Sequence, residues 1–292
     1  MDHTGTLLTA LGTAFGAGGV GVVMATRGNM PRLRESVLTR RYLTWLALTL
    51  LYGIPTLFGP VGVLILAILL ATVAAREAAP LLGLTGPYRV ALLALCAALP
   101  ALLFVGHGEW SAGLIILAAI GLPIVRGNTD ELAQGARLAC GALLIGWTLA
   151  HLVPLAQAGQ GWITLALFGT AVSDVCAFVV GSLVGGAKLA PKISPGKTWS
   201  GLVGNIVGAA LALLLTAPML PRLALPTLVA VVLIIGLGGC LGDLAESLLK
   251  RQAGVKDAGD WLPGFGGLLD RIDSLLAVAP LLVVLLTIVG LW

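Results

Sequence analysis

The sequence predicts an all-α, polytopic integral membrane protein with about nine to ten transmembrane helices. Of its 292 residues, 58% are hydrophobic and only 10% are charged, and the mean hydropathy is +1.04. A soluble domain carries about 25% charged residues, so this composition excludes a soluble enzyme. The apolar runs are continuous, whereas a transmembrane β-barrel shows short alternating segments. The basic residues form no block, which argues against a nucleic-acid partner.

Ten apolar runs are candidates for the membrane-spanning helices. A helix needs about 20 mostly apolar residues to cross the hydrocarbon core, and several of the runs are shorter or contain proline. The 40 glycines of the chain suit the close approach of helices in lipid. The runs lie near residues 6–25, 42–58, 60–75, 89–105, 110–125, 138–157, 162–184, 201–219, 226–247 and 272–291.

The basic residues divide the connections between these runs into two sets. Sixteen of the 17 lysines and arginines lie in or beside alternate connections, and Arg222 is the exception. By the positive-inside rule, the basic side faces the cytoplasm. We therefore expect a multi-pass protein of the cell inner membrane, with both termini outside and its active site on the cytoplasmic side.

Two polar loops distinguish the second half of the chain. Residues 185–200 contain three lysines, and residues 248–271 mix acidic and basic residues with glycine and proline. The first half has no comparable concentration of reactive side chains. We interpret the chain as one membrane domain, with an N-terminal transmembrane scaffold over residues 1–160 and a catalytic transmembrane region over residues 161–292.

Acidic residues lie inside or at the ends of apolar runs in this second half. Carboxylates at membrane depth are costly, so they are functional candidates. Asp243, Glu246 and Lys250 follow helical spacing, as do Asp270 and Asp273, so each set shares one helix face. Asp174 is a further acid in an apolar run. Carboxylates at this density repel one another unless a cation lies among them, and Mg²⁺ or Mn²⁺ prefers such oxygen ligands.

Lysines and arginines surround these acids in the two loops. Basic side chains of this kind can bind several phosphate oxygens, and Gly266 and Gly267 allow the backbone to approach phosphates closely. Carboxylates, bases and glycines at the headgroup level together predict phosphoryl or nucleotidyl transfer on a lipid phosphate. The basic residues are Lys188, Lys192, Lys197, Lys250, Arg251, Lys256 and Arg271.

Residues 165–290 resemble a known enzyme family. The run from Ser247 to Asp273, SLLKRQAGVKDAGDWLPGFGGLLDRID, is similar to the signature of phosphatidate cytidylyltransferases, which are also called CDP-diacylglycerol synthases. The stretch from Asp174 to Gly181 and the segment KLAPKISPGKTW from Lys188 to Trp199 resemble a second characteristic block of that family. The long C-terminal signature is specific to this family.

The resemblance implies an enzyme that joins CTP to phosphatidate, releases pyrophosphate and forms CDP-diacylglycerol for phospholipid synthesis. It implies dependence on Mg²⁺, with or without a monovalent cation, and a homodimeric membrane protein. Asp243 and Asp270 match the metal-binding aspartates of the family. Asp257 and Asp273 match positions associated with nucleotide and phosphate handling.

The resemblance also implies roles for the basic and hydroxyl side chains. The phosphatidate phosphate would attack the α-phosphorus of CTP, and catalysis would consist of positioning and charge neutralisation. Lys250, Lys256 and Arg271 would bind the triphosphate, and the segment from Lys192 to Thr198 would bind the other phosphate. The predicted binding residues, apart from Lys250 and Lys256, are Lys188, Lys192, Ser194, Lys197, Thr198, Ser247, Arg251, Gly266, Gly267 and Arg271.

Two positions depart from the family pattern. Phe265 stands where the family usually has His, and Ser200 stands where it usually has Glu. These departures leave open two alternatives on a different membrane lipid, namely cytidylyl transfer or CTP-dependent phosphorylation. A cation-coupled transporter with acids at the bilayer midplane is a third alternative, but most of the acids here lie near one membrane face beside lysines.

Overall fold

The computed structural model describes residues 37–127, 129–259 and 266–292, and this part of the chain is almost entirely helical. Seven of its helical spans are long and apolar enough to cross a membrane. The all-α membrane fold expected from the sequence is therefore confirmed, and the chain is a multi-pass membrane protein. The seven spans are Gly59–Leu81, Gly86–Phe104, Leu132–Ala158, Gln160–Val184, Trp199–Met219, Leu225–Gln252 and Leu269–Ile288.

The first half of the described chain consists of helices joined by short turns. It begins with α3 (Val37–Leu57), α4 (Gly59–Leu81), α5 (Gly86–Phe104) and α6 (Trp110–Arg126). Both α3 and the 17-residue α6 fall outside the set of seven spans. The last span of this half follows η1 (Thr129–Glu131) and runs through α7 (Leu132–Gly141), the π-helical turn η2 (Ala142–Trp147), α8 (Thr148–Ala150) and α9 (Leu152–Ala158).

The second half contains the remaining helices and one small hairpin. It consists of α10 (Gln160–Val184), β1 (Lys188–Ala190), β2 (Ser194–Thr198), α11 (Trp199–Thr216), η3 (Ala217–Met219), α12 (Leu225–Leu233), the π-helical turn η4 (Ile234–Gly238), α13 (Gly239–Gln252), α14 (Leu269–Ile272) and α15 (Leu275–Ile288). Nine of the ten predicted runs coincide with helices of this structure. The first run, residues 6–25, lies outside the described residues.

The hairpin is a feature that the sequence did not predict. β1 and β2 pair antiparallel, with Lys188 opposite Thr198 and Ala190 opposite Ser194. The strands have only three and five residues, and they lack the long apolar alternation by which a strand is recognised. The predicted loop 185–200 is therefore partly ordered by strand pairing, which fixes where its lysines stand.

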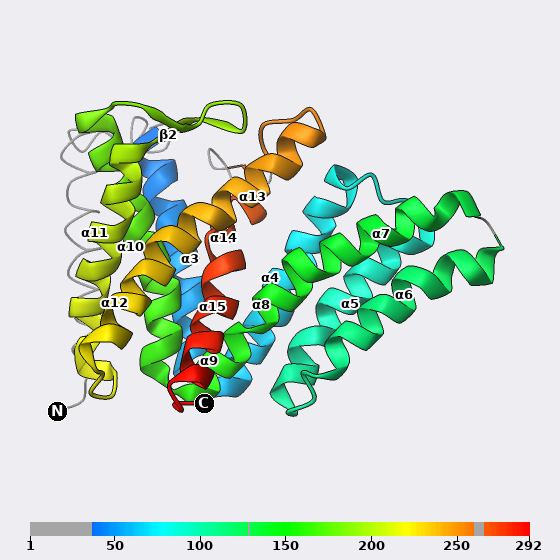
Figure 1. Cartoon of the computed structure of the whole chain (residues 1–292), viewed down its shortest axis with the longest axis horizontal. Helices are drawn as coiled ribbons and strands as arrows, with labels where there is room; N and C mark the ends of the chain where they lie inside the picture. Colours follow the sequence, from blue (N-terminus) through cyan, green and yellow to red (C-terminus); the bar gives the residue numbers. More distant parts are fainter. Residues whose placement is uncertain (1–36, 128, 260–265) are drawn as a thin grey trace.

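Helix α4 runs through the middle of the packing. Its buried face consists largely of alanine, with Ala67, Ala71 and Ala74 fully buried beside Leu66 and Leu70. Small side chains allow neighbouring helices to approach closely in lipid, and α4 accordingly packs against α3, α5 and α9. In Figure 1, α4 and α8 lie between α5, α6 and α7 on one side and α10 to α13 on the other.

The two ends of the helical bundle differ in charge. The hairpin and the C-terminal end of α13 lie together at one end, and the connection from η3 to α12 and the C-terminus lie at the opposite end (Figure 1). The first end carries the lysines of both polar loops, whereas the η3–α12 connection carries Arg222. This arrangement matches the two sets of connections predicted from the basic residues.

Candidate functional site

A cavity of about 730 Å³ opens at the lysine-bearing end. Its walls come from α10, the hairpin, α11, α13, residues 256–257 and the segment from Asp270 to Asp273. Six basic and five acidic side chains line it, so anions and cations both find partners there. Of the predicted site residues, the cavity brings together Lys188, Ser194, Lys197, Thr198, Asp243, Ser247, Lys250, Arg251, Lys256, Asp257, Asp270, Arg271 and Asp273.

Lys197 and Asp243 form an ion pair across this cavity. The Lys197 Nζ lies 2.7 Å from Asp243 Oδ2, and the two side chains are 19% and 33% exposed. Burial disfavours the charged ammonium, but the Asp243 carboxylate outweighs that effect and raises the pKa of Lys197. Lys197 therefore stays protonated at neutral pH. The pair joins strand β2 to helix α13, two elements that are far apart in the sequence.

Lys250 bridges two carboxylates at the end of α13. Its Nζ lies 2.5 Å from Glu246 Oε2 and 2.6 Å from Asp270 Oδ1. Glu246 is fully buried, and Lys250 and Asp270 are each 9% exposed. Charges this deeply buried are stable only when they are paired. The predicted helical stripe of Asp243, Glu246 and Lys250 is confirmed, because all three lie on α13 with Lys250 paired to Glu246. Ser247 donates to Asp243 Oδ1 at 3.2 Å, and carboxylate oxygens of Asp243 and Glu246 lie within 4.8 Å of each other.

Asp270 also holds the loop that precedes it. Its Oδ2 accepts hydrogen bonds from the backbone N–H of Gly267 at 2.7 Å and of Ala258 at 3.1 Å. With Lys250 on Oδ1, both oxygens of this carboxylate already have protein partners. Gly266 has a left-handed φ of 77°, and a Cβ added there would lie 2.6 Å from Asp270 Oδ2. The turn therefore requires glycine at this position.

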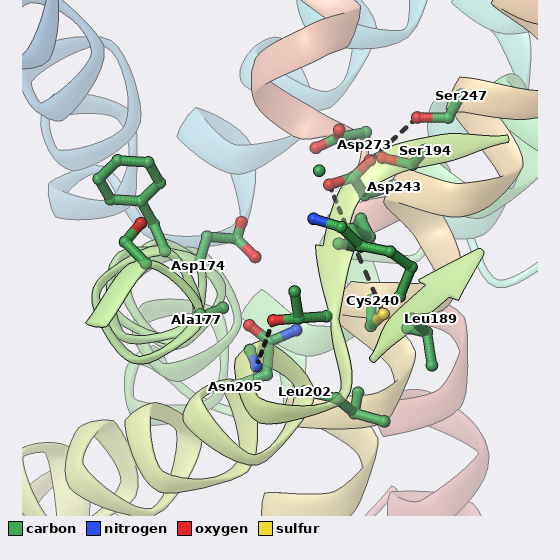
Figure 2. Close-up of a pocket in the computed structure, with 18 of the residues that line it drawn as sticks. Asp174, Ala177, Leu189, Ser194, Leu202, Asn205, Cys240, Asp243, Ser247 and Asp273 are labelled. Atoms are coloured by element: carbon green, nitrogen blue, oxygen red, sulfur yellow. Dashed lines mark hydrogen bonds and ion pairs between the residues drawn. The ribbon is translucent and has the colours of Figure 1, made fainter. Parts of the chain in front are cut away.

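Three carboxylates form a group that can hold a cation. Oxygen atoms of Asp243, Glu246 and Asp273 lie within 4.8 Å of one another. Figure 2 shows Asp243 and Asp273 next to each other, with Asp174 pointing towards the same space from α10. Helices α13 and α15 meet closely here, because a Cβ on Gly242 would collide with the carbonyl oxygen of Asp273. A cluster of hard oxygen donors of this kind fits a divalent cation.

This group differs from the predicted metal pair of Asp243 and Asp270. Both residues line the cavity, but the carboxylates that converge with Asp243 are those of Asp273 and Glu246. Asp273 accepts from the backbone N–H of Ser274 at 2.8 Å, and the Ser274 hydroxyl donates to Asp174 at 2.9 Å. Asp174 is therefore connected to the same network through one serine.

Several predicted binding residues have structural partners. Thr198 Oγ1 accepts from the N–H of Gly201 and so caps α11. Arg251 donates to the carbonyl oxygens of Ile193 and Val255, which ties the hairpin to the end of α13. Ser200, which replaces the family Glu, donates to the carbonyl oxygen of Gly185. These contacts set the shape of the cavity rim.

Three predicted residues do not line the cavity. Lys192 is exposed in the turn between β1 and β2. Gly266 and Gly267 approach carboxylates of the protein, because a Cβ on Gly267 would lie 2.5 Å from Glu77 Oε2. Phe265 lies outside the described residues. The structure thus separates the basic residues that line the cavity from Lys192, which does not line it.

Sequence reasoning missed Glu77 as part of this region. Glu77 comes from the C-terminal part of α4 and is 8% exposed. Its carboxylate accepts from the backbone N–H groups of Leu268 and Leu269 at 2.9 and 2.7 Å. The signal that could have found it is a lone glutamate near the end of a long apolar run, to which the argument about membrane carboxylates also applies.

Fold and cavity together define a polytopic membrane protein with a buried acid-and-lysine site at one end of its helices. The sequence model of the Cytidylyltransferase family matches residues 39–289. The chain therefore belongs to the cytidylyltransferase family, which confirms the resemblance found in its motifs.

The chain is also similar to individual proteins, two of which are named as phosphatidate cytidylyltransferases. The chain is 36% identical over 187 residues to a protein of Brucella suis biovar 1 named "Phosphatidate cytidylyltransferase", an alignment of 54% of this chain and 69% of the relative. It is 37% identical over 166 residues to a Bacillus subtilis protein of the same name, covering 55% and 61%. It is 37% identical over 177 residues to "Uncharacterized protein YnbB" of Escherichia coli K12, covering 58% and 59%. The chain thus spans between half and 70% of the length of these relatives.

Proposed function

We propose that this protein transfers a cytidylyl group from CTP to phosphatidate, forming CDP-diacylglycerol and pyrophosphate. The observation that carries the proposal is the cavity in which residues of both motifs meet, with Lys197 of β2 on Asp243 of α13. Family membership supports the nucleotide, and the names of the Brucella and Bacillus relatives support the lipid.

In the proposed reaction, an oxygen of the lipid phosphate attacks the α-phosphorus of CTP. A new P–O–P linkage forms, the bond from the α-phosphorus to its bridging oxygen breaks, and pyrophosphate leaves with that electron pair. Little covalent chemistry falls to the protein, so its contribution is orientation and charge neutralisation. Lys188, Lys250 and Lys256 line the cavity and would bind the phosphates of CTP.

Asp243, Glu246 and Asp273 would hold Mg²⁺ in this proposal. Their converging oxygens favour a divalent cation, and Lys250 balances part of their charge through Glu246. When bound, such a cation supplies charge neutralisation for the triphosphate and the departing pyrophosphate. Asp270 would orient Lys250 and the preceding loop, since its oxygens contact Lys250, Gly267 and Ala258.

A second, more apolar cavity supports a lipid acceptor. It has a volume of about 450 Å³ and shares Asp174, Phe178, Asp270, Arg271 and Asp273 with the first cavity. Its other walls include Leu167, Ala171, Val175 and Leu275. A lipid phosphate could reach the acids and Arg271 while the acyl chains stay among apolar side chains. This arrangement suits an acceptor that has a charged head and a hydrocarbon tail.

The topology and assembly belong to the same proposal. The lysine-bearing end of the bundle would face the cytoplasm in the cell inner membrane, as the positive-inside rule favours, and the working unit would be a homodimer. Cysteine labelling at introduced sites in the η3–α12 connection and the hairpin would test the orientation. Light scattering of the detergent-solubilised protein would test the dimer.

The decisive experiment is an assay of the purified chain in lipid vesicles with CTP, Mg²⁺ and phosphatidate. We expect equal amounts of pyrophosphate and CDP-lipid, and no product when EDTA removes the divalent cation. Pyrophosphate release that does not depend on lipid, or no turnover with an active relative as a positive control, would contradict the proposal.

One observation favours a second candidate, cytidylyl transfer to a different membrane lipid. Ser200 replaces the family Glu, and its hydroxyl contacts Thr198 and Gly185 at the cavity rim. The loss of a carboxylate changes the charge near the acceptor, which can change the preferred lipid. A panel of lipid phosphates with labelled CTP, run on the wild type and on Ser200→Glu, separates the two. A shift of preference towards phosphatidate in Ser200→Glu would support the second candidate.

A further inference from the structure

A buried carboxylate from the first half of the chain holds the start of α14. Glu77 lies in α4, and its Oε1 and Oε2 accept from the backbone N–H groups of Leu268 and Leu269 at 2.9 and 2.7 Å. These contacts span 191 and 192 residues of sequence. Both hydrogen bonds are buried, and a charged acceptor makes such bonds stronger than neutral ones.

The backbone around Glu77 closes tightly on its carboxylate. A Cβ on Gly267 would lie 2.5 Å from Glu77 Oε2, and one on Gly259 would lie 3.0 Å from Glu77 Oε1. Gly267 therefore permits a close approach that a larger residue would force apart, and at Gly259 a larger residue would require a smaller shift of the carboxylate. The signature glycine Gly267 thus has a protein carboxylate as its neighbour.

Two carboxylates together fix three consecutive backbone N–H groups. Asp270 accepts from Gly267, and Glu77 accepts from Leu268 and Leu269. The segment held in this way leads directly into Asp270 and Arg271, and then into Asp273, which lies in the carboxylate group with Asp243 and Glu246. A displacement of the segment would move Asp273 relative to Asp243.

We propose that Glu77 is a positioning residue of the active site, which fixes the start of α14 and thereby sets the cation-binding group of Asp243, Glu246 and Asp273. The catalytic consequence rests on the proposed function. Glu77 itself contacts backbone, so it acts through the residues that follow Leu269. Helix α4 of the first half is then part of the machinery that aligns the second half.

The test compares Glu77→Gln and Glu77→Ala with the wild type. Gln keeps one acceptor oxygen but turns an N–H₂ donor towards a backbone N–H, and Ala removes both acceptors. We expect Glu77→Gln to lower kcat by about 10–100-fold, the range for residues that orient metal ligands, and to raise the Mg²⁺ concentration for half-maximal rate. Glu77→Ala should have the larger effect if it folds, and the conclusion rests on Gln if it does not.

Glu131→Gln is the matched control. Glu131 also lies in the first half, is 18% exposed and lies outside the cavity lining; it pairs with Arg126 at 2.7 Å and accepts from the Tyr88 hydroxyl at 2.8 Å. The same chemical change at Glu131 should leave kcat and the Mg²⁺ dependence within about twofold of the wild type, because neither Arg126 nor Tyr88 lines the cavity. A lower thermal midpoint in Glu77→Gln with unchanged kcat per folded molecule and unchanged Mg²⁺ dependence would overturn the proposal.

Two measurements that need no turnover separate this proposal from the proposed function. Hydrogen exchange of the Leu268 and Leu269 amides should accelerate in Glu77→Gln and stay at the wild-type rate in Glu131→Gln. Binding of Mn²⁺, followed by its paramagnetic resonance signal, should weaken in Glu77→Gln only. If the wild type makes no CDP-lipid, the proposed function fails while these two measurements still decide the role of Glu77. Unchanged exchange or unchanged Mn²⁺ binding would refute that role.

Discussion

The helices from α3 to α9 and those from α10 to α15 differ in the kinds of side chain that they bury. In the first group, the interior is filled by fully buried apolar side chains such as Leu66, Leu92 and Leu149. In the second group, buried positions also hold Glu246, Lys250 and Asp270, whose charges are paired with one another. Apolar packing therefore dominates the interior of the first group, which also buries Glu77, whereas the second group buries several charges that need their ionic partners.

This difference shows how the fold accommodates a site whose buried charges cost stability. Isolated buried charges are strongly destabilising, and an ion pair inside a protein offsets that cost only when its geometry is good. The apolar helices provide a rigid support against which α14 and α15 are placed, through contacts of α4 with α14 and of α8 and α9 with α15. Glu77 makes a polar connection between the two groups.

The largest expected effect comes from the carboxylates of the second group. Asp243→Asn removes a charge from the cation-binding group and weakens the pair with Lys197. We expect turnover to fall by at least about 10²-fold, as when one electrostatic contact to developing charge is removed. Asp270→Asn should also abolish turnover, measured as labelled CDP-lipid.

Mn²⁺ binding distinguishes the reasons for these two losses. Asp243→Asn and Asp273→Asn should weaken binding more than Asp270→Asn, because Asp270 contacts Lys250 and the backbone and lies outside the group of converging oxygens. Equal weakening in all three variants would return Asp270 to the metal site predicted from the sequence. Full turnover in both Asp243→Asn and Asp270→Asn would remove the assignment of this cavity as the active site.

A core substitution in the first group should lower the stability of the protein and leave its catalytic rate unchanged. Leu149 is fully buried, so Leu149→Ala leaves a cavity and should lower the free energy of unfolding by about 2 kcal/mol. This is the low end for such a change, because the unfolded reference state in lipid also keeps the side chain away from water. The measurement is reversible unfolding in detergent, with kcat per folded molecule as the second readout. A tenfold fall in kcat per folded molecule would contradict the separation of the two groups.

A smaller effect, on the KM for CTP, is expected from replacing a lysine that lines the cavity. Both lysines are exposed, but Lys188 lines the cavity and Lys192, in the hairpin turn, does not. Lys188→Ala should raise the KM for CTP by about tenfold, since a hydrogen bond to a charged group contributes about 1.5–3 kcal/mol. Lys192→Ala, the matched control, should change it by less than about twofold because Lys192 does not line the cavity and an exposed charge without a ligand contributes little. Equal effects would show that the hairpin moves when CTP binds.

The smallest expected effect concerns pH. The pKa of Lys197 is raised by Asp243, and an unperturbed lysine has a pKa of about 10.4. The stabilisation from this pair is therefore fully present below that pH and is lost only as the pH rises through the higher folded pKa. The difference in thermal midpoint between wild type and Lys197→Met should stay constant from about pH 7 to 9. A difference that shrinks within that range would contradict the ion pair.

Much of the site was predictable because its residues are close in sequence. Asp243, Glu246 and Lys250 follow helical spacing, and the structure places them along α13 with Lys250 paired to Glu246 and the Glu246 and Asp243 oxygens within 4.8 Å of each other. The acids inside apolar runs also pointed to the site, since carboxylates at membrane depth cost free energy and usually have a functional role. The hairpin was missed because its strands are too short for a periodic signal. The exposed position of Lys192 in the turn of this hairpin was therefore missed as well.

The membrane class, the apolar spans and the family could be read from the amino-acid sequence, because hydropathy, helical spacing and motif order are local properties of the chain. Which carboxylates converge could not be read in this way, because it depends on how the helices pack. Asp273 rather than Asp270 lies with Asp243, since Gly242 lets α13 approach the Asp273 backbone while Lys250 and two N–H groups occupy Asp270. The same holds for Glu77, whose contact with Leu268 joins residues 191 positions apart. Packing between helices that are far apart in the sequence brings such groups together, and the spacing of residues along the chain does not predict these contacts.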